Sequence, residues 1–471
     1  MSKKGHKISR RDFLGQSCAA LGYTTLFSSL INLKAMAAAA MDNSLLIPYS
    51  GDYKAMVCIL LAGGNDSFNM LIPKGNYEYD EYATTRSNMS IAQNDILQIN
   101  PNTSDGRVFG LHPSMPDVQQ LFESSELAFL CNVGTLIEPS SKADILNKSV
   151  RTPLGLFSHA DQIQQWQTGR PHERTNLGWG GRIADLVQSM NSNQNISMNI
   201  SLQGSNVFQR GNEVIPYAIT NNGSIGIRGY NNSFDFDQLR TQALNSMMER
   251  DYQDIYKNTY INTIKTSNDS SLEFQAAIDG VSDFITPIPR NNNLARQLRM
   301  VAKSIAARDT LGFSRQIFFV QLGGWDNHDE LLLKQSRKLG QVNDALKYFS
   351  DLMTEINTND CVTTFSISDF GRTLTSNGNG TDHAWGGNAL IMGGAVNGKE
   401  MYGEYPTLAL NSEVDLKDGV MIPTTPADLY MAELALWFGV SPSDLSMILP
   451  NLPNFYDTSS GVPPLGFMNM S

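Results

Sequence analysis

Short, almost uninterrupted apolar runs alternate with helix-patterned stretches along most of this 471-residue chain. The apolar runs lie at residues 55–62, 127–133, 196–202, 316–322, 361–368 and 388–392. The helical patterns lie at residues 113–124, 180–190, 293–307, 334–356 and 426–438. A strand that is apolar on both faces is typical of a parallel sheet with helices on its two sides. The pattern therefore predicts an α/β fold with a mostly parallel central sheet and helices on both faces.

Residues 191–290 differ from the rest because they are rich in Asn, Ser and Gln and lack strong apolar periodicity. We expect a peripheral insertion or cap on the main sheet, with helical character near residues 235–274, and not a second independent core. Pro and Asn within residues 450–454 predict an irregular C-terminal tail.

The N-terminus has the three parts of an export signal. A basic head precedes a weakly apolar stretch, residues 13–33, and small residues at 35–40 then offer an Ala-Met-Ala cleavage pattern. Paired arginines before an apolar pair resemble a twin-arginine signal, in the sequence Ser9-Arg10-Arg11-Asp12-Phe13-Leu14. Gly and polar residues interrupt the apolar stretch, so no stable membrane span is expected in the mature chain.

We therefore predict that residues 1–40 direct twin-arginine export. This implies the twin-arginine translocase as a partner and a periplasmic or secreted location. The alternative is an ordinary amphipathic N-terminal helix.

The chain is acidic, with 35 Lys and Arg against 46 Asp and Glu and a net charge of −11. A nucleic-acid partner held by a basic surface is therefore not expected. Cys58, Cys131 and Cys361 each belong to an apolar run, and no CxxC spacing is present. Three thiols in separate predicted strands indicate small buried hydrophobes, not a disulfide framework or a cysteine metal site.

Aspartates and histidines stand at the ends of several predicted strands, in segments that also contain Gly. Ligands bind beyond the carboxyl ends of the strands in open α/β sheets, so these positions are candidates for a site. A mixed Asp and His set suits a divalent metal such as Zn²⁺ or Mn²⁺. Any single member is explained as well by a helix cap or a turn, but the whole set is not. The candidate ligands are Asp66, Asp326, His328, Asp369 and His383.

Ser158 and His159 stand at the start of a helix-like segment. Ser158 is a candidate nucleophile, because the positive end of a helix favours a developing alkoxide. The alternative, which the local sequence alone favours, is a simple N-cap. His159 is open to being a ligand, a base or a surface residue. Arg372, three residues after Asp369, is a candidate for pairing with a phosphate or sulfate group, or for balancing nearby carboxylates.

Five ordered motifs resemble the exported bacterial family catalogued as domain of unknown function 1501. They are Gly63-Gly64-Asn65-Asp66, Ser158-His159-Ala160-Asp161-Gln162, Gly323-Gly324-Trp325-Asp326-Asn327-His328, Ser368-Asp369-Phe370-Gly371-Arg372-Thr373 and Thr381-Asp382-His383-Ala384-Trp385-Gly386-Gly387. Segments 425–430 and 437–440 fit the family too, so the resemblance covers nearly all of residues 41–471. That family is similar in turn to the alkaline phosphatase and sulfatase superfamily. The resemblance implies an alkaline phosphatase-like fold.

Members of that superfamily hydrolyse phosphate or sulfate esters with one or two metals and a Ser, Thr or modified Cys nucleophile. The order of the motifs implies that Asp66 is a metal ligand and that Ser158 is the nucleophile. It also implies that Asp326 and His328 bind one metal together with His383. Asp369 would serve a second metal.

Two features depart from the superfamily pattern. The residue after Asp369 is Phe370 where a His is usual, and phenylalanine cannot bind a metal. The second metal then depends on His159 or Ser158. The spacing from Asp326 to His328 is two residues, shorter than the expected four. Such a pair reaches one ion from a loop, but not from one face of a helix.

The first hypothesis is an exported hydrolase of sulfate or phosphate esters that uses one or two divalent metal ions, Zn, Mn or Ca. Arg372 would neutralise the non-bridging oxygens of the anionic ester substrate. The alternative is a non-catalytic binding or scaffold protein of the cell envelope on a degraded alkaline phosphatase-like fold. Phe370 favours this alternative, and the intact Asp326, His328 and His383 oppose it.

Overall fold

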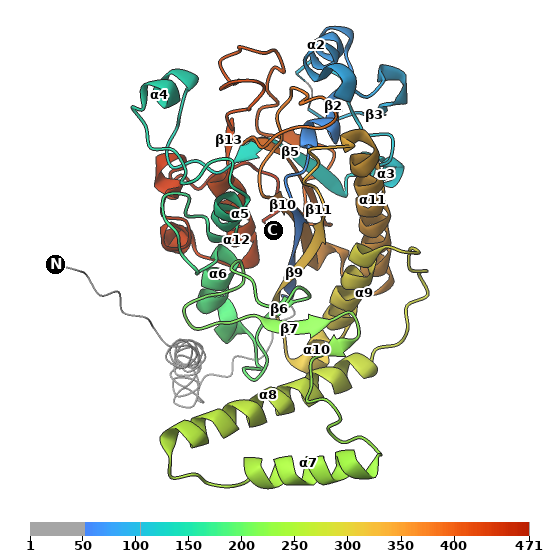
Figure 1. Ribbon diagram of the computed structural model, residues 1–471, viewed down its shortest axis with the longest axis vertical. Helices are drawn as coiled ribbons and strands as arrows, with labels where there is room; N and C mark the ends of the chain where they lie inside the picture. The colour runs from blue at the N-terminus through green and yellow to red at the C-terminus, as the bar shows by residue number, and fades with distance from the viewer. Residues whose placement is uncertain (1–51, 104, 471) are drawn as a thin grey trace, which may run out of the picture. The chain divides into compact units, whose positions relative to one another are not determined.

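The computed structural model describes residues 52–103 and 105–470 (Figure 1). The predicted export signal at residues 1–40 lies outside the described residues. The strands are β1 (Lys54–Ala62), β2 (Leu71–Pro73), β3 (Leu97–Ile99), β4 (Phe109–Leu111), β5 (Leu127–Gly134), β6 (Asn199–Ser201), β7 (Tyr217–Thr220), β8 (Gly223–Ser224), β9 (Arg315–Gly323), β10 (Val362–Ser368), β11 (Gly387–Met392), β12 (Met401–Tyr402) and β13 (Thr425–Pro426).

The described residues also form α-helices, most of which lie between these strands in the sequence. They are α2 (Asn76–Arg86), α3 (Pro116–Glu123), α4 (Lys142–Asn147), α5 (His159–Thr168), α6 (Trp179–Val187), α7 (Asp235–Met248), α8 (Ile255–Asp279), α9 (Asn293–Ala306), α10 (Arg308–Leu311), α11 (Leu331–Glu355), α12 (Ala427–Phe438) and α13 (Leu445–Ile448). The predicted apolar runs and helical patterns are thus confirmed as strands and helices, with ends that differ by a few residues.

The central sheet has ten strands in the order β12-β5-β11-β10-β1-β9-β6-β7-β8, with β13 paired to β5. Its middle strand, β1, pairs in parallel with β9 on one side and β10 on the other. Every residue of β1 except its two ends is buried. Most pairs in the sheet are parallel, which confirms the predicted fold class.

Strand β11 runs antiparallel to both of its neighbours, β10 and β5, although its apolar run resembles those of the parallel strands. The reason is the connection. Parallel strands need a crossover, usually through a helix. The chain leaves β10, passes through residues 369–386 without forming a helix, and re-enters the sheet from the same edge.

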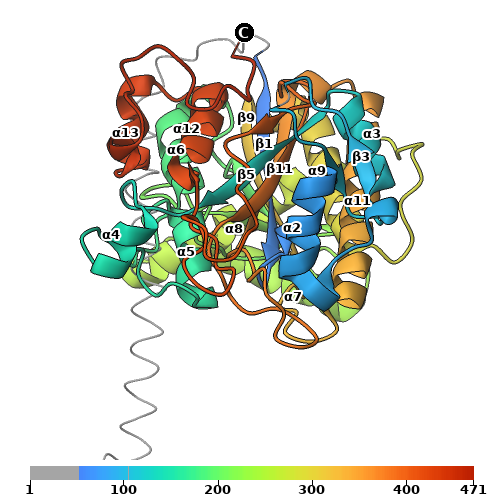
Figure 2. The ribbon, with the colours of Figure 1, turned by 90° about the horizontal axis from the view of Figure 1, so that it is seen from above.

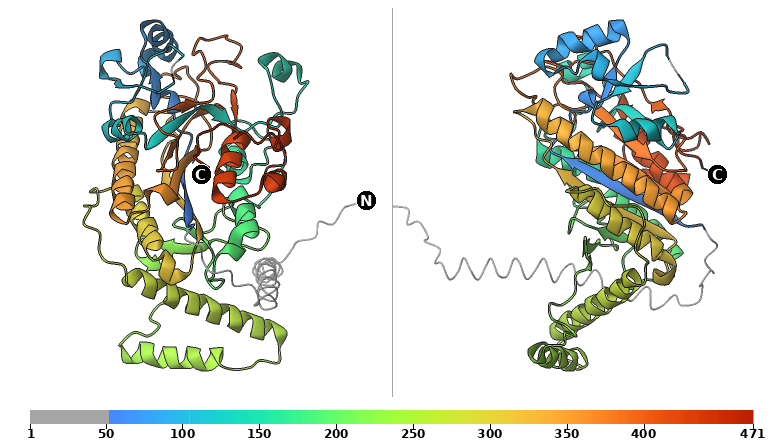
Figure 3. Two further views of the ribbon diagram at one scale, coloured as in Figure 1. Left: turned by 180° about the vertical axis from the view of Figure 1, so that it is seen from behind. Right: turned by 90° about the vertical axis from the view of Figure 1, so that its right-hand side faces the viewer.

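Helices cover both faces of the sheet, as predicted. Helices α9 and α11 lie side by side with α3 on one face, and α5, α6 and α12 lie on the other (Figures 1 and 2). In the right-hand view of Figure 3, α9 and α11 lie over one face of the sheet, and β1 is visible between them. Helix α9 buries an apolar stripe, Leu294, Leu298, Val301 and Ile305, at helical spacing, and the Asn292 side chain caps its first turn.

The carboxyl ends of the three middle strands meet at one edge of the sheet. In the strand register Leu61 lies opposite Ser368, and Ala62 lies opposite Gly323. The loops that follow β1, β9 and β10 therefore start next to one another. This alignment brings together residues that are hundreds of positions apart in the sequence.

Within the predicted insertion, β6 and β7 extend the central sheet beyond β9. Residues Gly226–Glu273, with α7 and the first part of α8, belong to a different compact unit from residues Tyr49–Ile225 and Phe274–Ser471. The interpretation of residues 191–290 as a cap stays a prediction. Among the described residues, every helix is too short or too polar to cross a membrane.

Candidate metal centre

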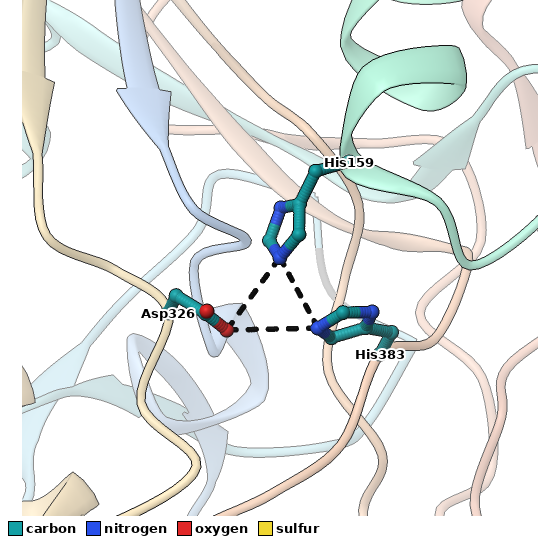
Figure 4. Close-up of side chains that lie close together, drawn as sticks. All are labelled: His159, Asp326 and His383. Atoms are coloured by element: carbon teal, nitrogen blue, oxygen red, sulfur yellow. Dashed lines mark hydrogen bonds and ion pairs between the residues drawn. The ribbon is translucent and has the colours of Figure 1, made fainter.

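Three side chains from separate elements converge at the carboxyl edge of the sheet (Figure 4). His159 is the first residue of α5, Asp326 lies in the loop after β9, and His383 lies in the loop before β11. His159 Nε2 lies 3.1 Å from His383 Nε2 and 3.6 Å from Asp326 Oδ1. His383 Nε2 lies 3.6 Å from the same Asp326 oxygen. Ligands about 2.0–2.1 Å from a tetrahedral Zn²⁺ stand about 3.4 Å apart, so the three atoms fit one ion.

His328 lies at the same place. Its Nε2 atom is 3.0 Å from Asp326 Oδ1 and 2.9 Å from His383 Nε2. The two-residue spacing does let Asp326 and His328 approach one point, because the chain between them is a loop. His328 is therefore a fourth candidate ligand.

The partners of the outer ring nitrogens show that Nδ1 carries a proton in all three imidazoles. His159 Nδ1 faces Asp369 Oδ2 at 2.7 Å, and His328 Nδ1 faces Asp382 Oδ1 at 3.1 Å. His383 Nδ1 faces the backbone oxygen of Phe157 at 2.7 Å. Carboxylate and carbonyl oxygens only accept, so each Nδ1 donates its proton.

With the proton on Nδ1, the neutral form of each imidazole presents a lone pair at Nε2. In that form the Nε2 lone pairs of His159 and His383, 3.1 Å apart, and the Asp326 oxygen repel one another unless a cation lies between them. A partner that holds Nδ1 is also the usual outer support of a metal-binding histidine. The donor set therefore fits a divalent metal.

Arg372 contacts the same Asp326 oxygen from the protein side. Partial burial works to raise the pKa of Asp326, but the Arg372 hydrogen bond and charge lower it below its ordinary value. Burial also lowers the pKa of His383, which keeps that imidazole neutral. Both effects keep the two ligands in the forms that bind a metal.

The centre is open to solvent. The side chain of Asp326 is 49% exposed, and those of His159 and His328 are 34% and 43% exposed. A structural metal site is closed, whereas a catalytic one leaves a position open. The exposure therefore fits a centre that admits a substrate.

Two expected metal ligands lie elsewhere in the network. Asp66 is fully buried and pairs with Arg86 of α2, and burial raises its pKa despite that arginine. Asp369 accepts hydrogen bonds from His159 and, at 3.0 Å, from the Gly63 backbone nitrogen. Asp369 thus supports a ligand from behind.

Arg372 does not face the open side of the centre, where we expect the ester oxygens. Its side chain is 0% exposed. It donates to the backbone oxygens of Gly63, Gly64 and Thr381 at 2.8, 2.9 and 2.7 Å. These contacts favour the second role considered for Arg372, balancing a nearby carboxylate, and its pairing with a phosphate or sulfate group stays a prediction.

Ser158 is the N-cap of α5. Its Oγ accepts from the Asp161 backbone nitrogen at 3.4 Å, and its hydroxyl bonds the Asp161 carboxylate. Phe157 before it has a left-handed φ of 72°, a costly conformation for a bulky residue. That conformation aims the Phe157 carbonyl at His383.

Phe370 packs against two of the ligands. Its ring centroid lies 4.7 Å from that of His159 and 4.6 Å from that of His383. On its other side stands Gly64, with a φ of 82°, where an added Cβ would lie 2.5 Å from the Phe370 ring. The ring therefore fills the space beside the candidate metal position.

Sequence reasoning missed two supporting residues. Asp382 directly precedes His383 in a Gly-rich loop, and this position next to a candidate ligand was the available signal. Arg86 pairs with Asp66 and donates to the Thr373 backbone oxygen at 3.0 Å. It lies in a helix without any local signal.

A family model described as "Protein of unknown function (DUF1501)" matches residues 53–440. No curated protein matches the chain. Among solved structures, the PsFucS1 sulfatase from Pseudoalteromonas sp. is 10% identical with a TM-score of 0.35, over 88% of this chain and 70% of that chain. An alkaline phosphatase superfamily protein from Vibrio parahaemolyticus is 11% identical with a TM-score of 0.29, over 73% and 61%. A TAB5 alkaline phosphatase mutant is 11% identical with a TM-score of 0.30, over 73% and 92%.

Proposed function

The chain belongs to the family described as Protein of unknown function (DUF1501), and we propose that it is an exported metal-dependent hydrolase of sulfate or phosphate esters. One observation carries the proposal. The Nε2 atoms of His159 and His383 and an oxygen of Asp326 converge within 3.6 Å of one another. The motif resemblance to the alkaline phosphatase and sulfatase superfamily supplies the ester class.

His159, Asp326 and His383 would hold the ion, with His328 beside them. Imidazole-rich sets suit Zn²⁺ or Mn²⁺, whereas Ca²⁺ prefers oxygen ligands throughout, so we favour the first two metals. A bound divalent ion supplies Lewis acidity toward an ester oxygen.

We propose a single ion. Asp66 and Asp369, the carboxylates expected for a second ion, are engaged by Arg86 and by His159. Phe370 occupies the space beside His159 and His383. The carboxylates that we expected to bind a second metal ion are therefore engaged by other side chains.

Ser158 is the candidate nucleophile, because it directly precedes His159 and caps α5. Its Oγ would bond to the sulfur or phosphorus atom as the ester oxygen leaves with the bonding electron pair. The hydroxyl proton would pass to Asp161, whose carboxylate it already contacts, and from there to the leaving ester oxygen, which departs as an alcohol. Water would then bond to the sulfur or phosphorus atom and return one proton to Ser158 Oγ. The net reaction adds one water and releases an alcohol together with hydrogen sulfate, hydrogen phosphate or, from a diester, a phosphate monoester.

Elemental analysis and turnover test this function. The purified protein should contain about one Zn or Mn per chain and should hydrolyse aryl sulfates or aryl phosphates. His159→Ala and His383→Ala should lose both the metal and the activity. His172→Ala is the matched control, because His172 bonds Asn451 and contacts none of the candidate ligands.

The outcomes separate the two hypotheses. Bound metal without turnover of any ester would favour the alternative of a non-catalytic envelope protein. A folded, metal-free protein whose melting temperature does not change with chelator would overturn the metal centre itself. Export is tested separately, by replacing Arg10 and Arg11 with lysines and locating the chain.

A further inference from the structure

The segments that carry the candidate ligands and their supports are acidic. Residues 63–66, 157–159, 323–329 and 369–385 contain five aspartates, one arginine and no lysine. An anionic ester that enters the centre therefore meets few positive groups from these segments.

Among the charged groups that touch the candidate ligand side chains, carboxylates also outnumber guanidinium groups. Asp326, Asp369 and Asp382 supply three carboxylates, and Arg372 supplies one guanidinium. A single divalent cation would bring this set only to zero net charge. No positive charge would remain to balance a doubly charged ester.

Arg372 is not available to an ester. A guanidinium binds phosphate through two parallel N–H groups along one edge. In this chain Nε, Nη1 and Nη2 already donate to Gly64, Thr381 and Gly63, and Nη2 also contacts Asp326. The buried side chain presents no free edge to the open side of the centre.

Four basic residues of the described chain lie next to these segments, and all are engaged. Arg86 pairs with Asp66, and Lys334 Nζ donates to the Asp329 backbone oxygen at 3.0 Å. Arg174 Nε donates to Asp161 Oδ1 at 2.7 Å, and Lys338 Nζ donates to the Gly323 backbone oxygen at 2.6 Å. Their charges are thus partly balanced or directed at the backbone.

From this charge distribution we infer that the ester group handled by the centre carries one negative charge, as in a sulfate monoester or a phosphodiester. A phosphate monoester with two charges is excluded from efficient binding. The inference rests on the proposed function. The repulsion between a second charge and a single carboxylate about 6 Å away would by itself weaken binding about threefold with water-like screening, and about a hundredfold at an effective dielectric constant of 20.

Three esters with the same leaving group test the inference on the metal-loaded chain at pH 8. They are p-nitrophenyl sulfate, bis(p-nitrophenyl) phosphate and p-nitrophenyl phosphate, and each kcat/KM is divided by the uncatalysed rate. Calorimetry adds a measurement without turnover, in which methyl phenylphosphonate with one charge is compared with phenylphosphonate with two. We expect the singly charged ligand to bind at least threefold tighter.

Asp382→Asn removes one rim charge, since this side chain is 60% exposed. It should reduce the preference for the singly charged phosphonate about threefold at equal metal content. Asp283→Asn is the matched control, because Asp283 pairs with Arg299 and Lys303 of α9 and should leave the preference unchanged.

Faster catalysed hydrolysis of p-nitrophenyl phosphate, or tighter binding of phenylphosphonate, would overturn this inference and leave the proposed function standing. No hydrolysis of any ester would overturn the proposed function, while the phosphonate titration would still decide the charge preference. Of the two singly charged esters, the one whose hydrolysis is accelerated more identifies the substrate class, sulfate monoester or phosphodiester.

Discussion

Arg372 connects most of the candidate metal centre. Its side chain holds Asp326 and the Gly63 and Gly64 carbonyls, and its backbone forms a bridge to His383. We expect Arg372→Lys to keep the charge but to lose the fork of donors. The chain should then lose both stability and metal affinity.

The size of the stability loss follows from the contacts. Lysine would leave at least two of the three buried carbonyl acceptors without a partner, at about 1–2 kcal/mol each. The pair with Asp326 adds no more than about 1 kcal/mol, because Asp326 is half exposed. The free energy of unfolding should therefore fall by about 2–5 kcal/mol.

Arg86→Lys is the matched control for this substitution. Arg86 is equally buried, pairs with Asp66 and donates to the backbone oxygens of Thr373 and Leu374. Within the described chain, its ion pair and hydrogen bonds involve none of the four side chains that converge at the centre, which are His159, Asp326, His328 and His383. The loss of stability in Arg86→Lys should be similar, about 2–5 kcal/mol.

Metal affinity should separate the two variants. Loss of an outer support typically weakens metal binding 10–100-fold, so Arg372→Lys should do so and Arg86→Lys should not. Urea unfolding measures stability, competition with a chelator measures the Zn²⁺ Kd, and the Co²⁺ absorption spectrum reports the ligand geometry. Equal weakening in both variants, or unchanged affinity and Co²⁺ spectrum in Arg372→Lys, would refute the reasoning.

Three further outcomes are expected. Asp369→Asn should weaken Zn²⁺ binding about 10–100-fold in a chelator competition, because the amide no longer provides a charged acceptor for His159 Nδ1; unchanged binding would contradict this. Gly64→Ala should destabilise the chain by about 1–3 kcal/mol in urea unfolding and displace Phe370, since a Cβ at φ +82° meets that ring; a neutral effect would exclude the packing argument. Burial raises the pKa of Asp428 to about 7 from 3.8, so the native chain binds the proton more tightly and loses stability as the pH rises between about 4 and 7. The advantage of Asp428→Asn over the wild type should therefore grow by up to roughly 4 kcal/mol across that range in unfolding at stepped pH, and a constant difference would disprove the shift.

The sequence alone determined the layers of the fold, because a strand that is buried on both faces requires a continuous run of apolar residues. Strand β1 is apolar along nearly its whole length, β9 contains the apolar run Ile317–Val320, and α9 repeats its apolar residues at helical spacing. The sequence did not show the direction of β11. Its apolar run is compatible with either orientation, and the helix-free connection decides between them.

The candidate ligands were also visible in the sequence, since strand-end Asp and His residues beside Gly mark the edge where loops gather. The sequence did not show which of these residues face the candidate metal position and which support the others. Only the tertiary structure buries Arg372, pairs Asp66 with Arg86 and sets Asp369 behind His159. The role of a side chain depends on which residues from distant segments it contacts. These contacts form only when the sheet aligns its strands.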